Sequence, residues 1–140
     1  ILLPYPFHLS GPYSINNFIM FIVALILGLF LVTALNLLMH ILTMFTLDEK
    51  GTMITYSVIA EIFMGGTIPI PFFPTWLKHI AEFLPFRFIG DFPFRIYSNS
   101  IPLEEGYILI IGSIIWIIIT ISLGYLISRV SLRKAVIQGG

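Results

Sequence analysis

The chain has 140 residues, 58% of them hydrophobic and 10% charged, with seven basic and seven acidic side chains and a mean hydropathy of +1.02. A soluble domain usually carries about a quarter charged residues, so this composition excludes an ordinary soluble domain and indicates a membrane protein. The zero net charge gives no basic excess for binding nucleic acid. The absence of cysteine excludes disulfides, thiol nucleophiles and Cys-based metal sites.

Two uninterrupted apolar runs are long enough to cross a bilayer, which takes about 20 residues in a helix. One covers residues 15–47, which carry no charge, and the other covers residues 106–128 near the C-terminus. Between them, residues 52–66 are apolar but short, and prolines follow at once. The pattern predicts an all-α membrane domain over residues 1–140 with three transmembrane helices, the second of which ends irregularly.

Basic residues near the span ends predict the orientation, because cytoplasmic loops carry an excess of Lys and Arg. Arg129, Arg133 and Lys134 follow the last span directly, which places the tail at residues 129–140 in the cytoplasm. Alternation then puts residues 48–50 inside, and both the N-terminus and residues 67–104 outside.

Residues 67–104 contain two short apolar segments, neither of which could cross a bilayer. The first, PTWLKHIAEFL from Pro74, has helical periodicity with Trp76 on its apolar face and Lys78 opposite, and FRFIGDFPFRIY follows Pro85. Backbone that is not helical at membrane depth must be satisfied by protein or by a water-filled cavity. We therefore expect a re-entrant or interfacial helical hairpin on the outer side, entered through the sequence GGTIPIPFFP.

Ionisable and polar side chains inside the spans are functional candidates, because they are costly in lipid. Glu61 shares a helical face with Ser57 and Gly65, so its carboxyl is expected to meet another helix or a cavity. It would be a proton, cation or substrate site, or a group that only fixes helix packing. In the first span Asn36 and His40 share a face with two threonines, and we expect that face to hydrogen-bond a neighbouring helix. The alternative for His40 is a ligand or proton-relay role.

Arg87, Asp91 and Arg95 follow one another at four-residue steps. They would form a plus-minus-plus triad on a helical face, although Pro93 disfavours helix at Phe92. The triad could gate the outer side or contact an anionic substrate, or it could be a self-neutralised group whose arginines reach lipid headgroups. The sequence has no HExxH, GxSxG or Walker-type motif, so we predict no catalytic residue, no metal site and no enzyme.

Residues 65–96, GGTIPIPFFPTWLKHIAEFLPFRFIGDFPFRI, resemble the signature region of exporter-type ABC-transporter permeases, in the subgroup of ABC-2 family transporter proteins. In that subgroup a span ends in a pair of small residues, and an Ile-Pro, a Pro-x-Trp-Leu, a Leu-Pro-Phe and a Pro/Arg pair follow. The matching positions here are Gly65 and Gly66, Ile68 and Pro69, residues 72–77, residues 84–86, and Pro93 with Arg95. The terminal QGG after a basic tail is also similar to the end of those proteins. Asn99 stands near where relatives often have a glycine.

The resemblance implies the C-terminal half of a six-span permease, with the hairpin forming outer re-entrant helices. Residues 1–14 lack an initiating Met and the basic region of a signal peptide, so we expect a longer protein. The family implies a multi-pass protein of the bacterial cytoplasmic membrane, paired with a second permease of the same or a sister kind. A separate ATP-binding cassette subunit would hold ATP and Mg, so this chain needs no cofactor of its own.

By this resemblance, the chain would form the pathway of an ATP-driven exporter for a hydrophobic or amphipathic substrate. A set of hairpin aromatics would then close the outer end as a single apolar lid: Phe72, Phe73, Trp76, Phe83 and Phe86. Two other functions stay open. A proton- or ion-coupled secondary transporter would use Glu61 and His40 and would lose transport on Glu61→Gln. The other is a non-transporting subunit of a membrane complex.

Overall fold

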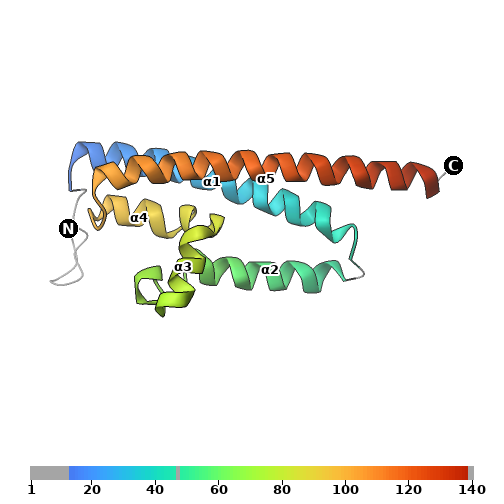
Figure 1. Cartoon of the computed structure of the whole chain (residues 1–140), viewed down its shortest axis with the longest axis horizontal. Helices are drawn as coiled ribbons and strands as arrows, with labels where there is room; N and C mark the ends of the chain where they lie inside the picture. The colour runs from blue at the N-terminus through green and yellow to red at the C-terminus, as the bar shows by residue number, and fades with distance from the viewer. Residues whose placement is uncertain (1–12, 47, 139–140) are drawn as a thin grey trace, which may run out of the picture.

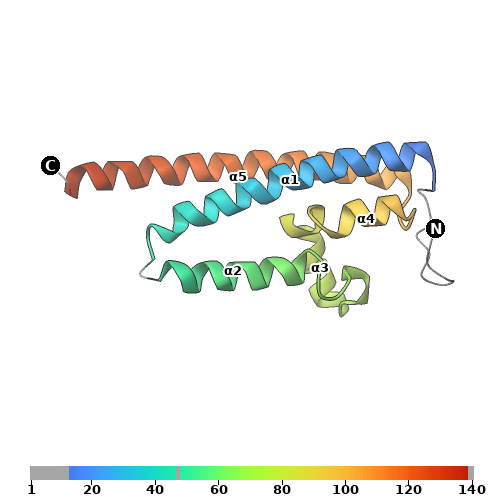
Figure 2. The ribbon, with the colours of Figure 1, turned by 180° about the vertical axis from the view of Figure 1, so that it is seen from behind.

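The regular structure of the described residues is entirely helical, as the pattern of apolar runs predicted. The computed structural model describes residues 13–46 and 48–138, with side chains up to residue 130. The elements in chain order are α1 (Ile15–Thr43), α2 (Glu49–Phe63), η1 (Ile70–Phe72), α3 (Thr75–Phe83), η2 (Pro85–Phe88), α4 (Asp91–Tyr97) and α5 (Leu103–Gln138). The helices α1 and α5 lie side by side along the molecule, with α2 and α4 on one side of them (Figures 1 and 2).

Two of the helices in the described residues, α1 and the Leu103–Val130 part of α5, are long and apolar enough to cross a membrane. The first span was predicted to reach residue 47, but α1 ends at Thr43, where the chain turns toward α2. The last span was predicted for residues 106–128, yet α5 continues to Gln138. No glycine or proline interrupts residues 125–138, so the expected tail extends the same helix.

The helix α2 has 15 residues and is about 22 Å long at a rise of 1.5 Å per residue. The hydrocarbon core of a bilayer is about 30 Å thick, so α2 alone is shorter than a usual span. It begins earlier than the predicted residue 52, because the side chain of Asp48 accepts a hydrogen bond of 2.9 Å from the Gly51 N–H and caps the helix. A transmembrane role for α2 stays a prediction.

Two glycines end α2, as the sequence predicted. The Gly65 N–H donates to the Ile62 carbonyl and the Gly66 N–H donates to the Glu61 carbonyl, both at 3.1 Å. This pair of bonds is the Schellman arrangement, whose central residue adopts a left-handed conformation. Gly65 has a φ of +80°, which costs a glycine little and a residue with a Cβ about 1–2 kcal/mol.

The predicted amphipathic helix after Pro74 is confirmed as α3, with Pro74 as its N-cap. The prediction that Pro93 disfavours helix at Phe92 is wrong, because α4 begins at Asp91 and includes both residues. Pro93 lies in the first turn of α4, where backbone N–H groups have no intrahelical partner, so its missing N–H costs no hydrogen bond there.

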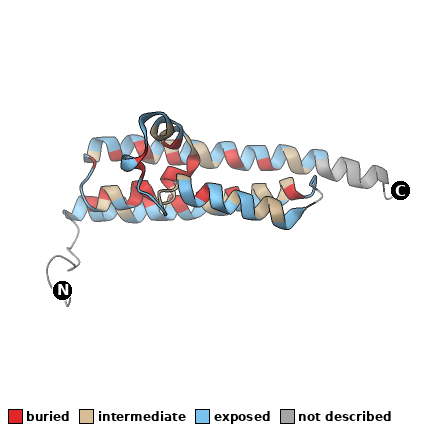
Figure 3. Ribbon diagram, turned by 90° about the horizontal axis from the view of Figure 1, so that it is seen from below, coloured by how far each residue is buried: buried red, intermediate tan, exposed pale blue. Residues whose placement is uncertain are grey.

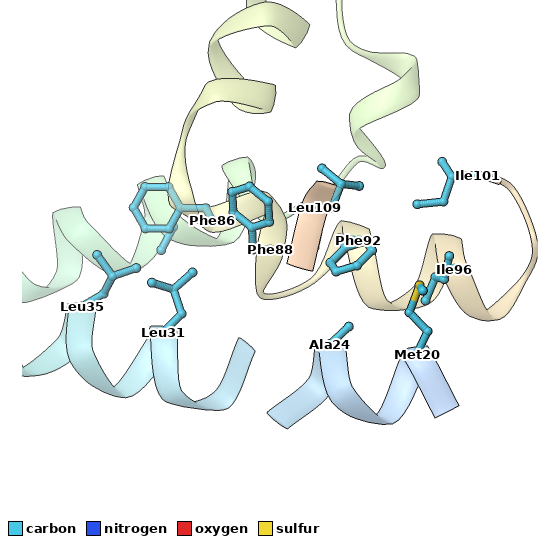
Figure 4. Close-up of a cluster of buried hydrophobic side chains, with 11 residues drawn as sticks. Met20, Ala24, Leu31, Leu35, Phe86, Phe88, Phe92, Ile96, Ile101 and Leu109 are labelled. Atoms are coloured by element: carbon cyan, nitrogen blue, oxygen red, sulfur yellow. The ribbon is translucent and has the colours of Figure 1, made fainter. Parts of the chain in front are cut away.

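The main core lies where α1, η2, α4 and α5 meet (Figure 4). The Gly28 position shows how close this packing is, since a Cβ there would lie 3.1 Å from the Phe88 carbonyl oxygen. Outside this contact zone the long helices are apolar but uncovered (Figure 3). Only 28% and 22% of their most apolar windows are buried within the chain, so most of both surfaces is free for lipid or for another subunit.

A buried asparagine joins the N-terminal end of α1 to the C-terminal end of α4. Asn17 is 1% exposed, and its Nδ2 donates to the Ile96 carbonyl at 2.9 Å and to Asn99 Oδ1 at 3.2 Å. Asn99 has a φ of 55°, a left-handed conformation that asparagine tolerates and glycine favours. The asparagine at this position, where the resemblance led us to expect a glycine, is therefore compatible with a left-handed turn.

Replacing Asn17 with alanine is expected to destabilise the protein by about 1–3 kcal/mol, because the hydrogen bonds from its Nδ2 to the Ile96 carbonyl and to Asn99 Oδ1 are both lost. Thermal unfolding of the purified protein in mild detergent measures the change. Asn16→Ala is the matched control, since Asn16 is the neighbouring residue and is exposed. Equal melting temperatures for the two variants would show that this link does not hold α4 to α1.

Candidate functional site

The polar face predicted on the first span makes no side-chain hydrogen bond to another helix among the described residues. Thr33 and Thr43 donate to carbonyls of their own helix at 2.7 and 2.8 Å, while Asn36 is exposed. His40 is also exposed, and its Nδ1 lies 3.8 Å from Glu49 Oε1 at the connection between α1 and α2. Among the described residues Asn36 and His40 therefore have no hydrogen bond to another helix, and a site role for either stays a prediction.

Glu61 lies on the outer surface of α2 rather than in the core. Its carboxylate Oε1 accepts a long hydrogen bond of 3.4 Å from the Thr67 hydroxyl, and Ser57, one turn earlier, is exposed as well. No helix of the described chain covers this face. The expectation that the Glu61 carboxyl meets another helix or a cavity is therefore not met within the described residues and stays a prediction.

The predicted triad of Arg87, Asp91 and Arg95 is divided between two elements, because the chain bends at Gly90 between η2 and α4. Arg95 Nη1 lies 3.4 Å from Asp91 Oδ2 in an ion pair within α4. Arg87 instead donates from Nη1 to the Glu82 carbonyl at 3.0 Å. The expected single face with three charges is therefore wrong, and only the last two side chains form a pair.

Both charges nearest the bend are buried, with Arg87 8% and Asp91 9% exposed. Burial raises the pKa of the Asp91 carboxyl, and the charge and hydrogen bond of Arg95 act in the opposite direction. Burial also lowers the pKa of Arg87, which the carboxylates of Glu82 and Asp91 counter. The Nε of Arg87 has no hydrogen-bond partner among the described residues, although its guanidinium lies 5.6 Å from the Phe88 ring centre.

The five hairpin aromatics do not form the single lid that was expected. Phe73 packs with Ile70 and Ala81 in a small cluster of its own, whereas Phe86 belongs to the main core. The other three side chains are exposed: Phe72, Trp76 and Phe83. The division arises because Leu84 and Pro85 turn the chain between α3 and η2, which sends Phe86 to another side of the hairpin.

A pocket of about 350 Å³ lies between the C-terminal turn of α2 and the helix α4. One wall consists of backbone and apolar side chains from the turn, and the other wall carries the Asp91–Arg95 pair. The lining residues are Met64, Gly65, Gly66, Pro69, Gly90, Asp91, Phe94, Arg95 and Ser98. Sequence reasoning named the two charges but missed the pocket, because it depends on how the turn after α2 packs against α4.

Metal chemistry finds no support in this part of the molecule. Among the described residues, no group of three His, Cys, Asp or Glu side chains is close enough to hold an ion. The described residues offer a largely apolar helical surface and, beside α4, a chiefly apolar pocket with one charged pair in its wall.

Comparison with known proteins supplies the class of this helical membrane domain. The model of the family described as "ABC-2 family transporter protein" matches residues 8–139, which is nearly the whole chain. No curated protein and no solved structure matches the sequence. The two long apolar helices agree with this family, whose members are non-enzymatic membrane components that work with an ATP-binding cassette subunit. The chain therefore belongs to the ABC-2 transporter family and is a permease domain of an ABC transporter.

Proposed function

We propose that this chain is the C-terminal half of a permease subunit in an ATP-driven exporter, and that it lines the path of a hydrophobic or amphipathic substrate. The family match over residues 8–139 carries the proposal. In it, α1, α2 and α5 are the fourth to sixth spans, and the segment from η1 to α4 is the outer re-entrant hairpin. ATP and Mg belong to the separate ATP-binding subunit.

The arrangement of the helix ends supports this topology. The α1–α2 connection and the C-terminal end of α5 lie toward one end of the molecule, whereas α4 and the start of α5 lie toward the other (Figure 1). Arg129 and the basic residues after it thus belong to the end that holds Asp48 and Lys50. With that end in the cytoplasm of a bacterial cell, the hairpin faces outward.

The depth of the hairpin supports a re-entrant course. Gly28 lies near the middle of α1, and the backbone at Phe88 and Ile89 is within 3.4 Å of the position of a Cβ there. The chain between η2 and α4 therefore reaches about half-way along α1 before it returns toward the outer end. In lipid, backbone at that depth must be covered by protein, and α1 and α5 provide the cover.

The uncovered face of α2 supports a second permease. Ile54, Val58 and Ile62 are 64%, 53% and 39% exposed, and the exposed Glu61 shares this helix. A carboxylate left facing lipid is costly, so we infer that a second permease or the pathway itself covers Glu61. The exposed apolar side chains of α2 would pack in the same contact.

Purification in mild detergent tests the proposed function. The permease is expected to co-purify with an ATP-binding cassette protein, and the complex is expected to show vanadate-sensitive ATPase activity. The control is a variant of the partner that lacks the phosphate-binding lysine of its Walker motif, in which the complex should form without ATPase activity. Absence of any such partner from complexes isolated from intact membranes would overturn the proposal.

Two aromatic residues of the hairpin are expected to differ in what their substitution changes, because Phe73 is buried and Trp76 is exposed. Phe73→Ala is expected to loosen α3 from the end of α2 and cost about 3 kcal/mol, because a buried ring is removed. Trp76 is 66% exposed, so Trp76→Ala should leave the melting temperature within about 2 °C of the wild type. We expect it to reduce substrate export from reconstituted vesicles, because the exposed ring faces lipid or the second permease at the outer end.

Substrate export and basal ATPase activity of the complex are measured together for both variants. Export and ATPase activity equal to those of the wild type in Trp76→Ala would show that the exposed face of α3 has no part in transport.

A further inference from the structure

One face of the helix α4 packs into the main core, and another face lines the pocket. Phe92 and Ile96 are fully buried and point toward the main core. Residues at positions i, i+3, i+4 and i+7 lie on another face of a helix, and here they line the pocket opposite the turn after α2: Asp91, Phe94, Arg95 and Ser98. The pocket therefore has one wall with a charged pair, and the rest of its lining is chiefly apolar or backbone.

In that wall the Asp91 carboxylate is paired with Arg95, whereas the Arg95 guanidinium has further N–H donors that this pair does not use. The Asp91 side chain is 5% exposed and accepts one bond of 3.4 Å from Arg95 Nη1. A guanidinium has five N–H donors, and the Arg95 side chain remains 24% exposed. Arg95 is thus a cation held in place by Asp91 at the wall of a pocket that can admit an anionic group.

The mouth of the pocket is apolar and uncovered. Phe94 lines the pocket and is 64% exposed, and Ile68, next to the lining residue Pro69, is 51% exposed. The pocket lies beside the N-terminal half of α1, between the level of the Asn17–Ile96 bond and the level of Gly28. This half of α1 belongs to an apolar helix of membrane-spanning length, so the pocket lies at a level where lipid can reach its open side.

We propose that the pocket binds the phosphate of a glycerophospholipid, whose oxygens accept hydrogen bonds from Arg95 and whose acyl chains lie along Phe94 and the exposed side of the hairpin. Arginine suits this role because its planar fork matches phosphate oxygens two at a time. The volume of about 350 Å³ is near the lower limit for drug-sized ligands. It accommodates a headgroup, and the acyl chains remain in the bilayer.

Free phosphate or another small anion shares the chemistry that Arg95 offers. The phospholipid is the better occupant because the exposed apolar side chains at the mouth, Phe94 above all, would gain nothing from a fully hydrated anion. The proposal depends only on the membrane location of the family, so it fails or holds independently of export and of the ATPase partner.

Native mass spectrometry of the full-length protein, released from phospholipid membranes into mild detergent, counts the lipids that stay bound. The double variant Asp91→Asn with Arg95→Gln removes both charges without leaving either unpaired. Its affinity for the retained phospholipid is expected to fall at least about tenfold, because charge-assisted hydrogen bonds to the phosphate are lost. Arg129→Gln is the matched control, since Arg129 is exposed at the far end of α5, where its guanidinium lies 5.2 Å from the Tyr125 ring centre.

A second variant keeps the ion pair and fills the pocket. Ser98 is exposed at the end of α4, so Ser98→Phe leaves the Asp91–Arg95 pair in place and should reduce phospholipid retention as well. Wild-type retention in both variants would overturn the proposal. It would also be overturned if the wild-type protein kept no phospholipid but bound inorganic phosphate in an Arg95-dependent way, because the site would then serve a free anion.

Discussion

Replacing Asp91 with alanine is expected to destabilise the protein by about 3 kcal/mol, because Arg95 then loses the counter-charge that holds it in a largely buried position. Removing both charges should be much less harmful. In the double variant Asp91→Leu with Arg95→Met the pocket wall becomes apolar, and most of the lost stability is expected to return. Thermal unfolding in mild detergent compares the single and double variants with the wild type.

An exposed pair at the same spacing provides the control. Lys78 and Glu82 lie on α3 with 3.9 Å between the charged atoms, and their side chains are 41% and 32% exposed. Lys78→Ala should change stability by less than about 1 kcal/mol. If Asp91→Ala cost no more than Lys78→Ala, the pair in α4 would be solvated, and the argument that Asp91 holds Arg95 at the pocket would fail.

The elements that could be predicted from the sequence are those whose signals are local. The apolar runs gave α1 and most of α5, and the pattern after Pro74 gave α3, because helical periodicity needs only neighbouring residues. The glycine pair gave the end of α2 for the same reason, since a Schellman turn is closed by bonds within six residues. Pro93 misled the prediction because its effect depends on its position within the helix, and it lies in the first turn.

The features that escaped prediction depend on contacts between distant parts of the chain. Arg87 and Asp91 are four residues apart, yet the bend at Gly90 gives their side chains different hydrogen-bond partners. The five aromatics look alike in the sequence, but only two of the rings are buried, and the turn after α3 places these two in different clusters. Asn17 was visible as a polar residue in an apolar run, and its partners, Ile96 and Asn99, lie about 80 positions away.

Gly90 is the position where a single methyl group is expected to do most harm to the hairpin. A Cβ there would lie 2.5 Å from the carbonyl oxygen of Met64 and 3.3 Å from its Cβ. The contact is with backbone, so it cannot be relieved by turning a side chain, and the end of α2 would have to move away from α4. We expect Gly90→Ala to cost about 1–3 kcal/mol and to open the pocket that these two elements enclose.

Gly124→Ala provides a matched control, for which the expected change in stability is zero or favourable. Its Cβ would meet only Ile41 Cδ1 at 3.8 Å, an ordinary contact with the end of a flexible side chain, and alanine favours a helix over glycine by up to about 1 kcal/mol. Unfolding of the two variants in mild detergent should therefore show a lower melting temperature for Gly90→Ala and an unchanged or higher one for Gly124→Ala. Equal effects would mean that α2 and α4 do not make the close backbone contact at Gly90. The re-entrant course would then lose its anchor at the end of α2, because that contact joins the bend before α4 to the turn that ends α2.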